Sequence, residues 1–403
     1  MKRIVLAYSG GLDTSFCLAW LREELGAEVL AVTADTGGFT PERSEEIAAR
    51  AMALGAESHI WLDLKDQVFD DFVSYIVKGN LLKGGVYPLC VAAERTAQAR
   101  SIAQLALERG ANGLAHGSTA AGNDQVRFDV LFRAIAPGLE IHAPVRDLGW
   151  TREREAAYLA ERGLALPPGT KEYSVNESLW GVTIGGKETH DPWTEPPEAV
   201  YQLTRPLART PDLPREIVLG FEKGIPVAID GERLPGPELV GRLNALAGEH
   251  GVGRGIHVGE TVLGIKGRIA FEAPAPLVLI QAHRELEKLV LTKWQAYWSA
   301  QVGLFYAQHL HEGSYLDPVM RDLEAFLDSL QERVTGEVRL ALHKGNARVA
   351  GVRSPHSLFG RGARYGEETA LWDGRDAAGF GKIAGISSRI AAERDRTSDP
   401  EGG

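Results

Sequence analysis

The residues best suited to chemistry stand near the start of the chain, in the heptad SGGLDTS at positions 9–15. Its two glycines let successive backbone N–H groups point towards one place, where they can bind an anion. Ser9, Thr14 and Ser15 add hydroxyl donors, and Asp13 can cap a helix or bind magnesium through water. A simple glycine-rich turn would use the same residue types. The apolar run RIVLAY before the heptad favours a phosphate-binding loop between a buried strand and a helix.

Two common nucleotide-binding motifs do not describe this loop. A Walker A loop requires a lysine beside its final Ser or Thr, and no lysine occurs between Lys2 and Lys65. The glycine spacing also differs from the GxGxxG dinucleotide fingerprint. The heptad therefore predicts phosphate binding of another type.

A second polar segment, HGSTAAGNDQVRFD at 116–129, follows the apolar run NGLAH. Gly117 and Gly122 permit close approach of the backbone to a ligand. Asp124 could accept an ammonium group and Arg127 could bind a carboxylate, so the segment suits a zwitterionic amino acid. A surface loop in which Asp124 and Arg127 pair with each other explains the same residues equally well.

The elements that must position these motifs alternate between strand and helix. Apolar runs and helical spacing predict strands at 3–8, 28–33, 58–62 and 112–116, and helices at 14–25, 41–54 and 94–109. This alternation predicts an α/β fold with an open parallel sheet and helices on both faces.

The pattern changes after about residue 165, where Leu166-Pro167-Pro168-Gly169 and Glu195-Pro196-Pro197 interrupt the helical spacing. We place a domain boundary there and expect an α+β domain after it. Its predicted elements are strands at 216–222 and 225–230, helices at 236–250, 282–311 and 318–334, and a hairpin of 336–342 with 347–352. The tail beyond Ser388 is polar, and we expect it to fray.

The composition excludes several classes of protein. The chain of 403 residues is 44% hydrophobic and 24% charged, which is unlike disordered and fibrous proteins. A formal net charge of −10 argues against a broad electrostatic grip on nucleic acid. Cys17 and Cys90, the only cysteines, are too few for a disulfide framework or a four-thiolate zinc site, and they fit a reduced compartment. The first apolar run is too short for a signal peptide and no stretch approaches membrane-spanning length, so we expect a cytoplasmic protein without membrane or nucleic-acid partners.

The heptad resembles the pyrophosphate loop of the N-type ATP pyrophosphatases, which cleave ATP between the α and β phosphates. This group includes argininosuccinate synthases, GMP synthetases, asparagine synthetases and tRNA-modifying thiolases. The combination of AYSGGLDTS with HGST and AGNDQVRF is typical of the argininosuccinate synthases, and VYPL, YSVNESLWG, HGVGR, GIKGR and VTGEV follow in the family's order. The chain is similar to that family over nearly its whole length.

The resemblance implies an ATP-dependent carbon–nitrogen ligase of arginine biosynthesis. The ureido oxygen of citrulline would attack the α-phosphate of ATP, pyrophosphate would leave, and the aspartate amine would displace AMP to form argininosuccinate. Mg²⁺ would accompany ATP, with its direct ligands left unassigned. The family architecture implies a nucleotide-binding domain of the adenine nucleotide α-hydrolase type at 1–165, a synthetase and multimerisation domain at 166–360, a C-terminal oligomerisation segment at 361–403, and a homotetramer.

Positions that match the family motifs define the expected site. The nucleotide would contact Ala7, Tyr8, Ser9, Gly10, Gly11, Leu12, Asp13, Thr14, Ser15, Ala34, His116 and Gly117. Aspartate would contact Thr119, Asn123 and Asp124. Citrulline would contact Tyr87, Asn123, Arg127, Ser174, Glu260 and Thr183, the last standing where a serine is usual. Asp13, Asp124 and Arg127 are the expected catalytic residues, and adenylyl transfer otherwise depends on positioning and charge neutralisation.

The chain departs from the family pattern at the amino-acid end of this site. The usual Gly-Thr-Ser-Leu-Ala-Arg-Pro reads Cys90-Val91-Ala92-Ala93-Glu94-Arg95-Thr96 here, so Ala92 lacks a hydroxyl. Phe271 stands where a citrulline-binding tyrosine is expected, and the alignment around Glu260 is shifted by one residue. Because a polar site rarely loses two donors without consequence, the ureido substrate could be an N-acylated citrulline. Variation within a divergent subfamily is the simpler interpretation, since the ATP and aspartate loops are intact.

Two other functions would use the same phosphate loop. A non-catalytic nucleotide-binding protein agrees with the lost donors but not with retention of both charged loops. A tRNA thiolase would need reactive cysteine chemistry and an RNA-binding surface, which two cysteines and an acidic chain do not favour. Of the remaining features, we expect His309 and His311 at the surface, and Trp294 and Trp298 in the core or in a subunit interface.

Overall fold

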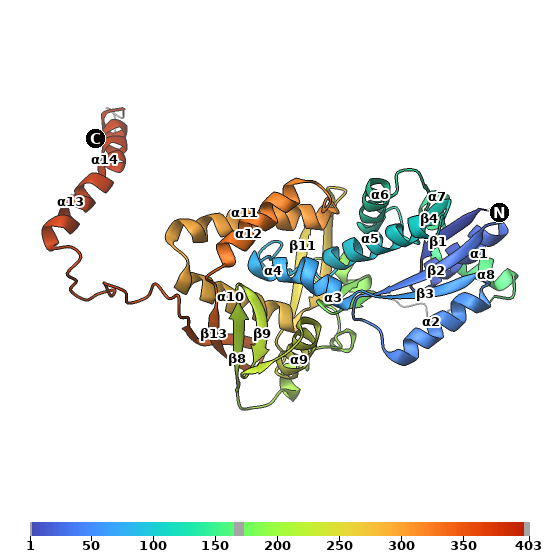
Figure 1. Cartoon of the computed structure of the whole chain (residues 1–403), viewed down its shortest axis with the longest axis horizontal. Helices are drawn as coiled ribbons and strands as arrows, with labels where there is room; N and C mark the ends of the chain where they lie inside the picture. The colour runs from blue at the N-terminus through green and yellow to red at the C-terminus, as the bar shows by residue number, and fades with distance from the viewer. Residues whose placement is uncertain (1, 165–172, 399–403) are drawn as a thin grey trace. The chain divides into compact units, whose positions relative to one another are not determined.

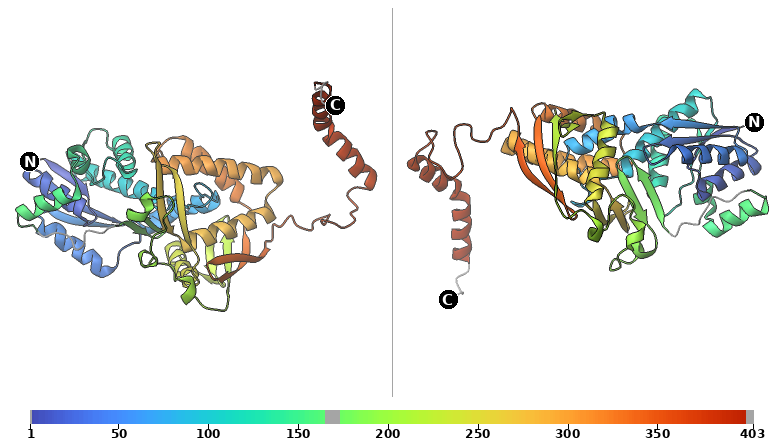
Figure 2. Two further views of the ribbon diagram at one scale, coloured as in Figure 1. Left: turned by 180° about the vertical axis from the view of Figure 1, so that it is seen from behind. Right: turned by 90° about the horizontal axis from the view of Figure 1, so that it is seen from below.

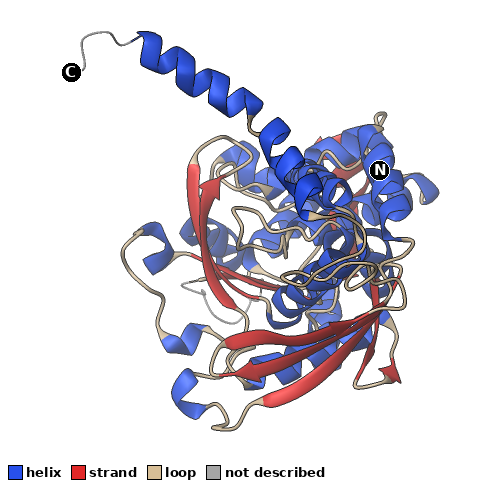
Figure 3. Ribbon diagram, turned by 90° about the vertical axis from the view of Figure 1, so that its left-hand side faces the viewer, coloured by secondary structure: helices blue, strands red, loops and turns tan. Residues whose placement is uncertain are grey.

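The computed structural model describes residues 2–164 and 173–398. The chain divides into two compact units, 1–356 and 357–403. Within the described residues, the first unit contains three β-sheets with helices packed around them (Figure 1, Figure 3). The predicted boundary at 165/166 and the turn at 166–169 lie outside the described residues.

The N-terminal sheet is parallel and has the strand order β3-β2-β1-β4-β5. Its strands are β1 (Arg3–Ala7), β2 (Glu28–Asp35), β3 (Ser58–Asp63), β4 (Gly113–Ala115) and β5 (Glu140–His142). The accompanying helices are α1 (Leu12–Glu23), α2 (Pro41–Ala53), α5 (Ala92–Glu108), α6 (Asp124–Ile135), α7 (Pro144–Leu148) and α8 (Arg152–Glu161). The predicted α/β fold with a parallel sheet is confirmed, with small differences at the ends of elements.

Both faces of this sheet are buried. Ile4 and Leu6 of β1 pack with Phe16 and other residues of α1, α2 and α8, whereas Val5 belongs to the larger core that includes α5 and α6. Alternate residues of one strand therefore enter two cores. This is why the strand sequences are continuously apolar instead of alternating with polar residues.

The strand order reverses at β1, which pairs with β2 on one side and β4 on the other. In open α/β sheets, ligands bind beyond the carboxyl ends of the strands at such a reversal. The heptad at 9–15 follows β1 and the segment at 116–129 follows β4. The topology thus brings the two polar segments to neighbouring strand ends.

A helical connection joins β3 to α5 and links the two halves of the first unit. It consists of α3 (Lys65–Val68), the π-helix η1 (Phe69–Val73) and α4 (Ser74–Lys78). Helix α4 packs against α10 (Pro274–Val290) and α12 (Val319–Gln331) (Figure 1). One apolar core consequently runs from the parallel sheet into the second half.

The second half of this unit contains two antiparallel sheets (Figure 2). One has the order β11-β12-β7-β6 and is formed by β6 (Ser174–Ser178), β7 (Gly181–Gly185), β11 (Arg254–Glu260) and β12 (Lys266–Glu272). The other has the order β10-β9-β8-β13-β14 and is formed by β8 (Arg215–Glu222), β9 (Ile225–Ile229), β10 (Glu232–Arg233), β13 (Gly336–His343) and β14 (Asn346–Arg353). The remaining helices are α9 (Gly236–Glu249), α11 (Lys293–Glu312) and the short 3₁₀ helices η2 (Lys187–His190), η3 (Glu198–Val200) and η4 (Leu207–Arg209).

The single helix expected over 282–311 is wrong in one respect, because two helices cover this range. Helix α10 ends at Val290 and α11 begins at Lys293. Thr292 caps α11 in a reciprocal capping box: its hydroxyl accepts from the Gln295 backbone N–H, and the Gln295 side chain accepts from the Thr292 N–H at 3.0 Å. In the described ranges, no helix is long and apolar enough to cross a membrane.

The second unit contains α13 (Gly374–Ala384) and α14 (Ile386–Ser398). Asp373 caps α13 by accepting from the backbone N–H groups of Arg375 and Asp376. The expectation that the tail frays beyond Ser388 is wrong, since α14 continues through this region. An Arg389–Glu393 pair spaced i, i+4 supports that helix.

Candidate active site

The heptad forms the turn between β1 and α1. Gly10 adopts a left-handed backbone with φ 72°, and its carbonyl accepts from Nη1 of Arg50 at 2.6 Å. A Cβ at position 10 would lie 2.8 Å from Cγ1 of Ile47. Both the backbone conformation and the contact with α2 therefore require glycine at this position.

The start of α1 has the character of an anion site. Gly11 occupies the N-cap position and no side chain of the described residues caps the helix. The hydroxyls of Ser9 and Thr14 lie 3.2 Å apart at this end, and Ser15 Oγ lies 3.4 Å from the hydroxyl of Tyr8. The first N–H groups of a helix need acceptors and carry its partial positive charge. The loop thus offers the donors and the dipole of a phosphate site.

Asp13 and Glu155 lie beside the loop as an acidic pair. Asp13 Oδ1 and Glu155 Oε2 are buried, and among the described residues no group outside the pair donates to them. Burial, followed by the charge of Asp13, raises the pKa of Glu155 to about 8. Arg152 contacts the other oxygen of Asp13 at 3.4 Å. A hydrogen bond with Asp13 adds to the rise in the pKa of Glu155, so the two carboxyl groups share a proton beside the loop.

The end of β4 packs directly against the phosphate loop. A Cβ at Gly117 would lie 3.0 Å from Cγ2 of Thr14, so only glycine fits easily. His116 is buried, and its Nδ1 accepts from the Ser118 N–H at 3.2 Å. Its Nε2 therefore carries the proton and donates to Asp129 at 3.1 Å. Both ring nitrogens of His116 are occupied by the protein, which leaves its imidazole no polar atom for a nucleotide.

Asp124 joins two arginines. Helix α6 begins at Asp124, so Asp124 and Arg127 lie in a helical first turn and not in a loop, and they pair with each other, as the alternative interpretation of this segment expected. Asp124 Oδ1 accepts from Arg127 Nη1 and Oδ2 from Arg95 Nε, both at 2.8 Å. Arg95 also donates to Asn176 Oδ1 at 2.6 Å. Burial opposes ionisation, but Arg95 and Arg127 lower the pKa of Asp124 to about 2. The ionised carboxylate thus links α5, α6 and β6.

The other residues expected at the substrates differ in exposure. Asn123 Oδ1 accepts from the Val262 N–H at 2.8 Å, which ties the β4–α6 loop to the β11–β12 turn. Ala34 is buried in β2, whereas Thr119 and Ser174 are exposed. Asn123 is the N-cap residue of α6 and Asp124 is its first residue, so these two predicted aspartate ligands lie together at the start of that helix.

Tyr87, Thr183 and Phe271 come together around β12. Tyr87 is buried, and its ring stacks against His257 at 5.6 Å and packs with Phe271 at 5.4 Å. Thr183 of β7 pairs with Phe271 in the sheet register. Across the β11–β12 pair, the Phe271 ring lies over Gly255, where a Cβ would overlap it. The place of the expected tyrosine is therefore taken by a closely packed apolar ring.

Glu94 was not among the predicted site residues. It lies in the first turn of α5, is 2% exposed, and accepts from the hydroxyl of Ser178. Ser178 Oγ in turn accepts from the Trp180 N–H at 3.1 Å. Burial raises the pKa of Glu94 to about 8. Glu94 thereby connects the helix that carries Arg95 to the β6–β7 turn.

The carboxylate of Glu260 is engaged elsewhere. It is exposed and pairs with Lys266 along the β11–β12 hairpin. The backbone carbonyl of Glu260, and not its side chain, accepts from Lys83 Nζ at 3.2 Å. The residue expected to bind the citrulline amine therefore has a protein cation as its partner.

The expected surface position of His311 is wrong. Arg127 Nε donates to the His311 carbonyl at 2.9 Å, and Arg127 Nη2 lies 3.2 Å from His311 Nδ1. The ring is 7% exposed. Trp294 and Trp298 are 65% and 55% exposed, so they do not belong to the core of this chain. The other expectation for the two tryptophans, a subunit interface, stays a prediction.

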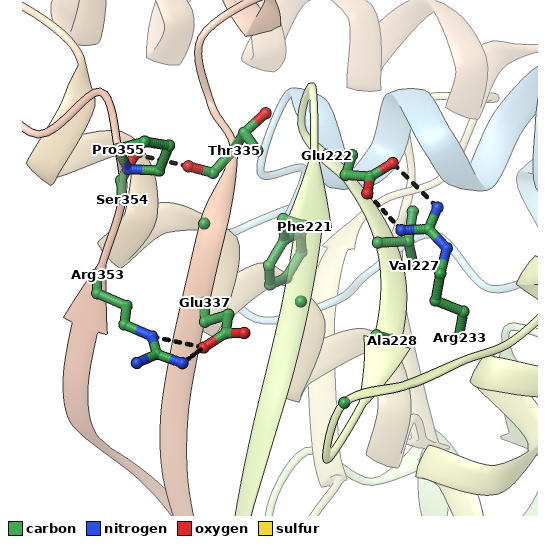
Figure 4. Close-up of a pocket in the computed structure, with 13 residues that line it drawn as sticks. Phe221, Glu222, Val227, Ala228, Arg233, Thr335, Glu337, Arg353, Ser354 and Pro355 are labelled. Atoms are coloured by element: carbon green, nitrogen blue, oxygen red, sulfur yellow. Dashed lines mark hydrogen bonds and ion pairs between the residues drawn. The ribbon is translucent and has the colours of Figure 1, made fainter.

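Two further features lie apart from these residues. A surface groove of about 620 Å³ runs over β8, β9, β13 and β14, and no predicted site residue lines it (Figure 4). Arg233 pairs with Glu222 and Arg353 with Glu337 within it.

Among the described residues, no three His, Cys, Asp or Glu side chains are grouped to hold a metal ion. A metal here would need the phosphate oxygens of a nucleotide as ligands.

Comparison with known proteins identifies the family. The family models described as "Arginosuccinate synthase N-terminal HUP domain" and "Arginosuccinate synthase C-terminal domain" match residues 3–165 and 173–391. The chain belongs to the argininosuccinate synthase family. It is 44% identical to the argininosuccinate synthase of Rubrobacter xylanophilus over 96% of this chain and 94% of that protein. It is 40% identical to that of Pyrococcus furiosus over 96% of this chain and 94% of that protein. It is 39% identical to that of Methanocaldococcus jannaschii over 98% of this chain and 100% of that protein.

Within this argininosuccinate synthase framework, Arg95, Asn176, Glu94 and His311 are the residues that sequence reasoning missed. Arg95 and Glu94 had a signal, because two charged residues begin the helix that follows Tyr87. Asn176 and His311 had none, since their contacts join elements far apart in the chain.

Proposed function

We propose that the protein catalyses the ATP-dependent ligation of citrulline and aspartate to argininosuccinate, with release of AMP and pyrophosphate through a citrullyl-adenylate. The phosphate loop carries this proposal: Gly10 is left-handed, the start of α1 is uncapped, and the hydroxyls of Ser9 and Thr14 flank it. Membership of the argininosuccinate synthase family supports the same reaction.

The residues of this loop would act by binding and charge compensation. The β and γ phosphates would accept from the N–H groups at Gly11 and the first turn of α1, which leaves the α-phosphate open to the ureido oxygen. Negative charge grows on the departing pyrophosphate, and the helix dipole with the hydroxyls of Ser9 and Thr14 would stabilise it there. Transfer of the adenylyl group needs no covalent nucleophile.

Mg²⁺ would neutralise phosphate charge when bound with ATP. Asp13, whose carboxyl group lies beside the loop, would be a ligand for such an ion, since magnesium is usually held by one or two carboxylates together with substrate phosphates. Glu155, kept protonated by burial, would not compete as a second charged ligand.

The amino-acid substrates would bind between α5, α6 and the β6–β7 hairpin. We assign Thr119, Asn123 and Asp124 to aspartate, and Tyr87, Asn123, Arg127, Ser174 and Thr183 to citrulline. Asp124 can accept from an amine in addition to its two arginines, because a carboxylate has more acceptor positions than these contacts use. Its depressed pKa keeps it ionised for this role.

A second candidate is the same chemistry on an N-acylated citrulline. The pairing of Glu260 with Lys266 favours it, because an acylated α-nitrogen carries no charge and needs no carboxylate. The packed ring of Phe271 and the missing hydroxyl at Ala92 point the same way.

Pyrophosphate release from Mg-ATP tests both candidates. Aspartate is held constant and the partner is citrulline, N-acetylcitrulline or none. Release that depends on citrulline supports the first proposal, and preference for the acylated partner supports the second. No release with any partner refutes both and leaves a nucleotide-binding protein.

We also propose a homotetramer in the cytoplasm. The exposed aromatic side chains of Trp294, Tyr297 and Trp298 on α11 support association, as do exposed Phe380 and Ile383 on α13. The domain limits 1–165, 166–360 and 361–403 stay part of this proposal. Light scattering after gel filtration, on the full chain and on Trp298→Ser, measures the assembly.

A further inference from the structure

Arg50 of α2 reaches the phosphate loop from outside the heptad. Its Nη1 donates to the Gly10 carbonyl at 2.6 Å. Ile47, which lies three residues earlier on the same face of α2, fills the space where a Cβ of residue 10 would lie. Two side chains of one helix therefore hold Gly10, one through a charged hydrogen bond and the other through apolar contact.

The Gly10 carbonyl lies outside the hydrogen-bond ladder of α1. That ladder begins one residue later, where the Ser15 N–H donates to the Gly11 carbonyl at 3.0 Å. Within the described ranges, Arg50 supplies the hydrogen bond to the Gly10 oxygen. Because glycine permits many backbone conformations, a peptide between two glycines can rotate at little cost. The orientation of the Gly10–Gly11 peptide therefore depends on Arg50.

This orientation decides where the Gly11 N–H points. In a trans peptide, the C=O and N–H bonds point in opposite directions. With the carbonyl bound to Arg50, the Gly11 N–H points to the other side of the peptide, where its nitrogen lies 3.4 Å from Ser9 Oγ. Ser9 Oγ lies 3.2 Å from the Thr14 hydroxyl, so the N–H faces the same side as the hydroxyl donors of the phosphate loop.

The charge of Arg50 acts on a loop that has no cation of its own. Asp13 is the one charged residue at positions 9–15. In the part of the chain that the structure describes, no carboxylate pairs with Arg50. Burial raises the pKa of Tyr8, whereas the Ser15 hydroxyl and the charge of Arg50 lower it, so this charge acts at the start of the loop. A cation at the carbonyl end of a peptide also polarises its N–H group towards an anion.

We propose that Arg50 is a positioning residue of the ATP site, which holds the Gly10–Gly11 peptide so that the Gly11 N–H faces the β and γ phosphates of ATP and then the departing pyrophosphate. Arg50 binds the peptide and not the reacting atoms, so it acts on the phosphates through the backbone. Loss of its contact frees the peptide to rotate and removes one donor from the pyrophosphate. This inference rests on the proposed ligase function and adds to it a residue outside the heptad.

Calorimetric binding of inorganic pyrophosphate, Mg-ATP and AMP to the wild type, Arg50→Met and Arg50→Lys tests the proposal. Arg50→Met should weaken the binding of pyrophosphate and Mg-ATP about 10- to 100-fold, because the charged hydrogen bond that directs a phosphate donor is lost. AMP lacks the β and γ phosphates and should bind within about threefold of the wild type. Arg50→Lys keeps one charged donor and should bind pyrophosphate at least about threefold more tightly than Arg50→Met.

Arg22→Met is the matched control. Arg22 lies in the last turn of α1, away from the loop, and its Nη1 also donates to a backbone carbonyl of the α2 region, that of Leu54, at 2.8 Å. This variant should lose stability in urea unfolding but bind pyrophosphate as the wild type does. If Arg50→Met does not fold, Arg50→Lys decides, because its single donor replaces a planar fork and should still weaken pyrophosphate binding more than AMP binding.

Three results would overturn the positioning role: unchanged pyrophosphate binding by Arg50→Met, equal weakening of pyrophosphate and AMP, or the same loss in Arg22→Met. The ligase function can fail separately. Citrulline-dependent pyrophosphate release by the wild type, with unchanged pyrophosphate binding by Arg50→Met, refutes the role of Arg50 and leaves the ligase function. Selective loss of pyrophosphate binding in Arg50→Met, with no release by the wild type, refutes the ligase function and keeps the role of Arg50.

Discussion

Replacement of the buried Glu94 by glutamine should stabilise the protein at alkaline pH. Burial raises the pKa of Glu94 from 4.5 to about 8, so the folded carboxyl binds a proton that the unfolded chain has lost. The stabilisation from this proton is complete below about pH 4.5 and is lost as the pH rises through about 8. Each pKa unit corresponds to about 1.4 kcal/mol, which sets an upper limit of about 5 kcal/mol for Glu94. We expect Glu94→Gln to be more stable than the wild type by about 2–5 kcal/mol at pH 9.

Urea unfolding at pH 5, 7 and 9 measures this difference. At pH 5 both side chains are neutral and can hydrogen-bond Ser178, so the two proteins should agree within about 1 kcal/mol. Glu108→Gln is the control, because Glu108 is exposed at the other end of the same helix and should show no pH-dependent difference. If the free energies of unfolding of the wild type and Glu94→Gln differ by the same amount at pH 5 and pH 9, the assignment of a buried, neutral Glu94 is refuted.

Three other predictions concern the phosphate loop and the ion-pair network. Gly10→Ala should lower pyrophosphate release at least about 100-fold with unchanged circular dichroism, because it strains the loop, whereas Gly138→Ala, which has open space around it, should be neutral. Glu155→Gln should raise the thermal midpoint at pH 9 but not at pH 4. The reason is that folded Glu155 has a raised pKa, so the stability that its bound proton contributes is lost as the pH rises through about 8. Equal shifts of the midpoint at both pH values would contradict this prediction. Arg95→Lys should raise KM for aspartate about 10-fold, because Arg95 holds Asp124, and should raise the pKa of Asp124, measured from the acid limb of the rate profile. An unchanged acid limb would show that Arg95 does not control this carboxylate.

The parallel sheet was predictable because local and global signals agree there. A continuous apolar run followed by Gly10 is typical of a strand that is buried on both faces and ends in a left-handed turn, and the structure has both. The split between α10 and α11 also had a readable signal, since Thr292 and Gln295 have capping-box spacing within an otherwise uninterrupted apolar stripe.

The network around Asp124 was not predictable from spacing. Arg95 donates to this carboxylate, Asn176 accepts from Arg95, and His311 contacts the other partner, Arg127, so the network joins elements that are distant in the chain. His311 was expected at the surface from its spacing to His309 alone, but it is buried and Arg127 of α6 contacts both its backbone carbonyl and its ring. Contacts of this type depend on tertiary packing, and a single sequence carries no period or motif that reports them.

Because the Phe271 ring lies over Gly255, the residues allowed at these two positions depend on each other. A side chain at 255 cannot be accommodated while the ring keeps this place, so the two positions are free to drift only together. A tyrosine at position 271 would place its ring in the same space and would also require glycine at position 255. The side-chain volume allowed at one of these positions therefore depends on the residue at the other.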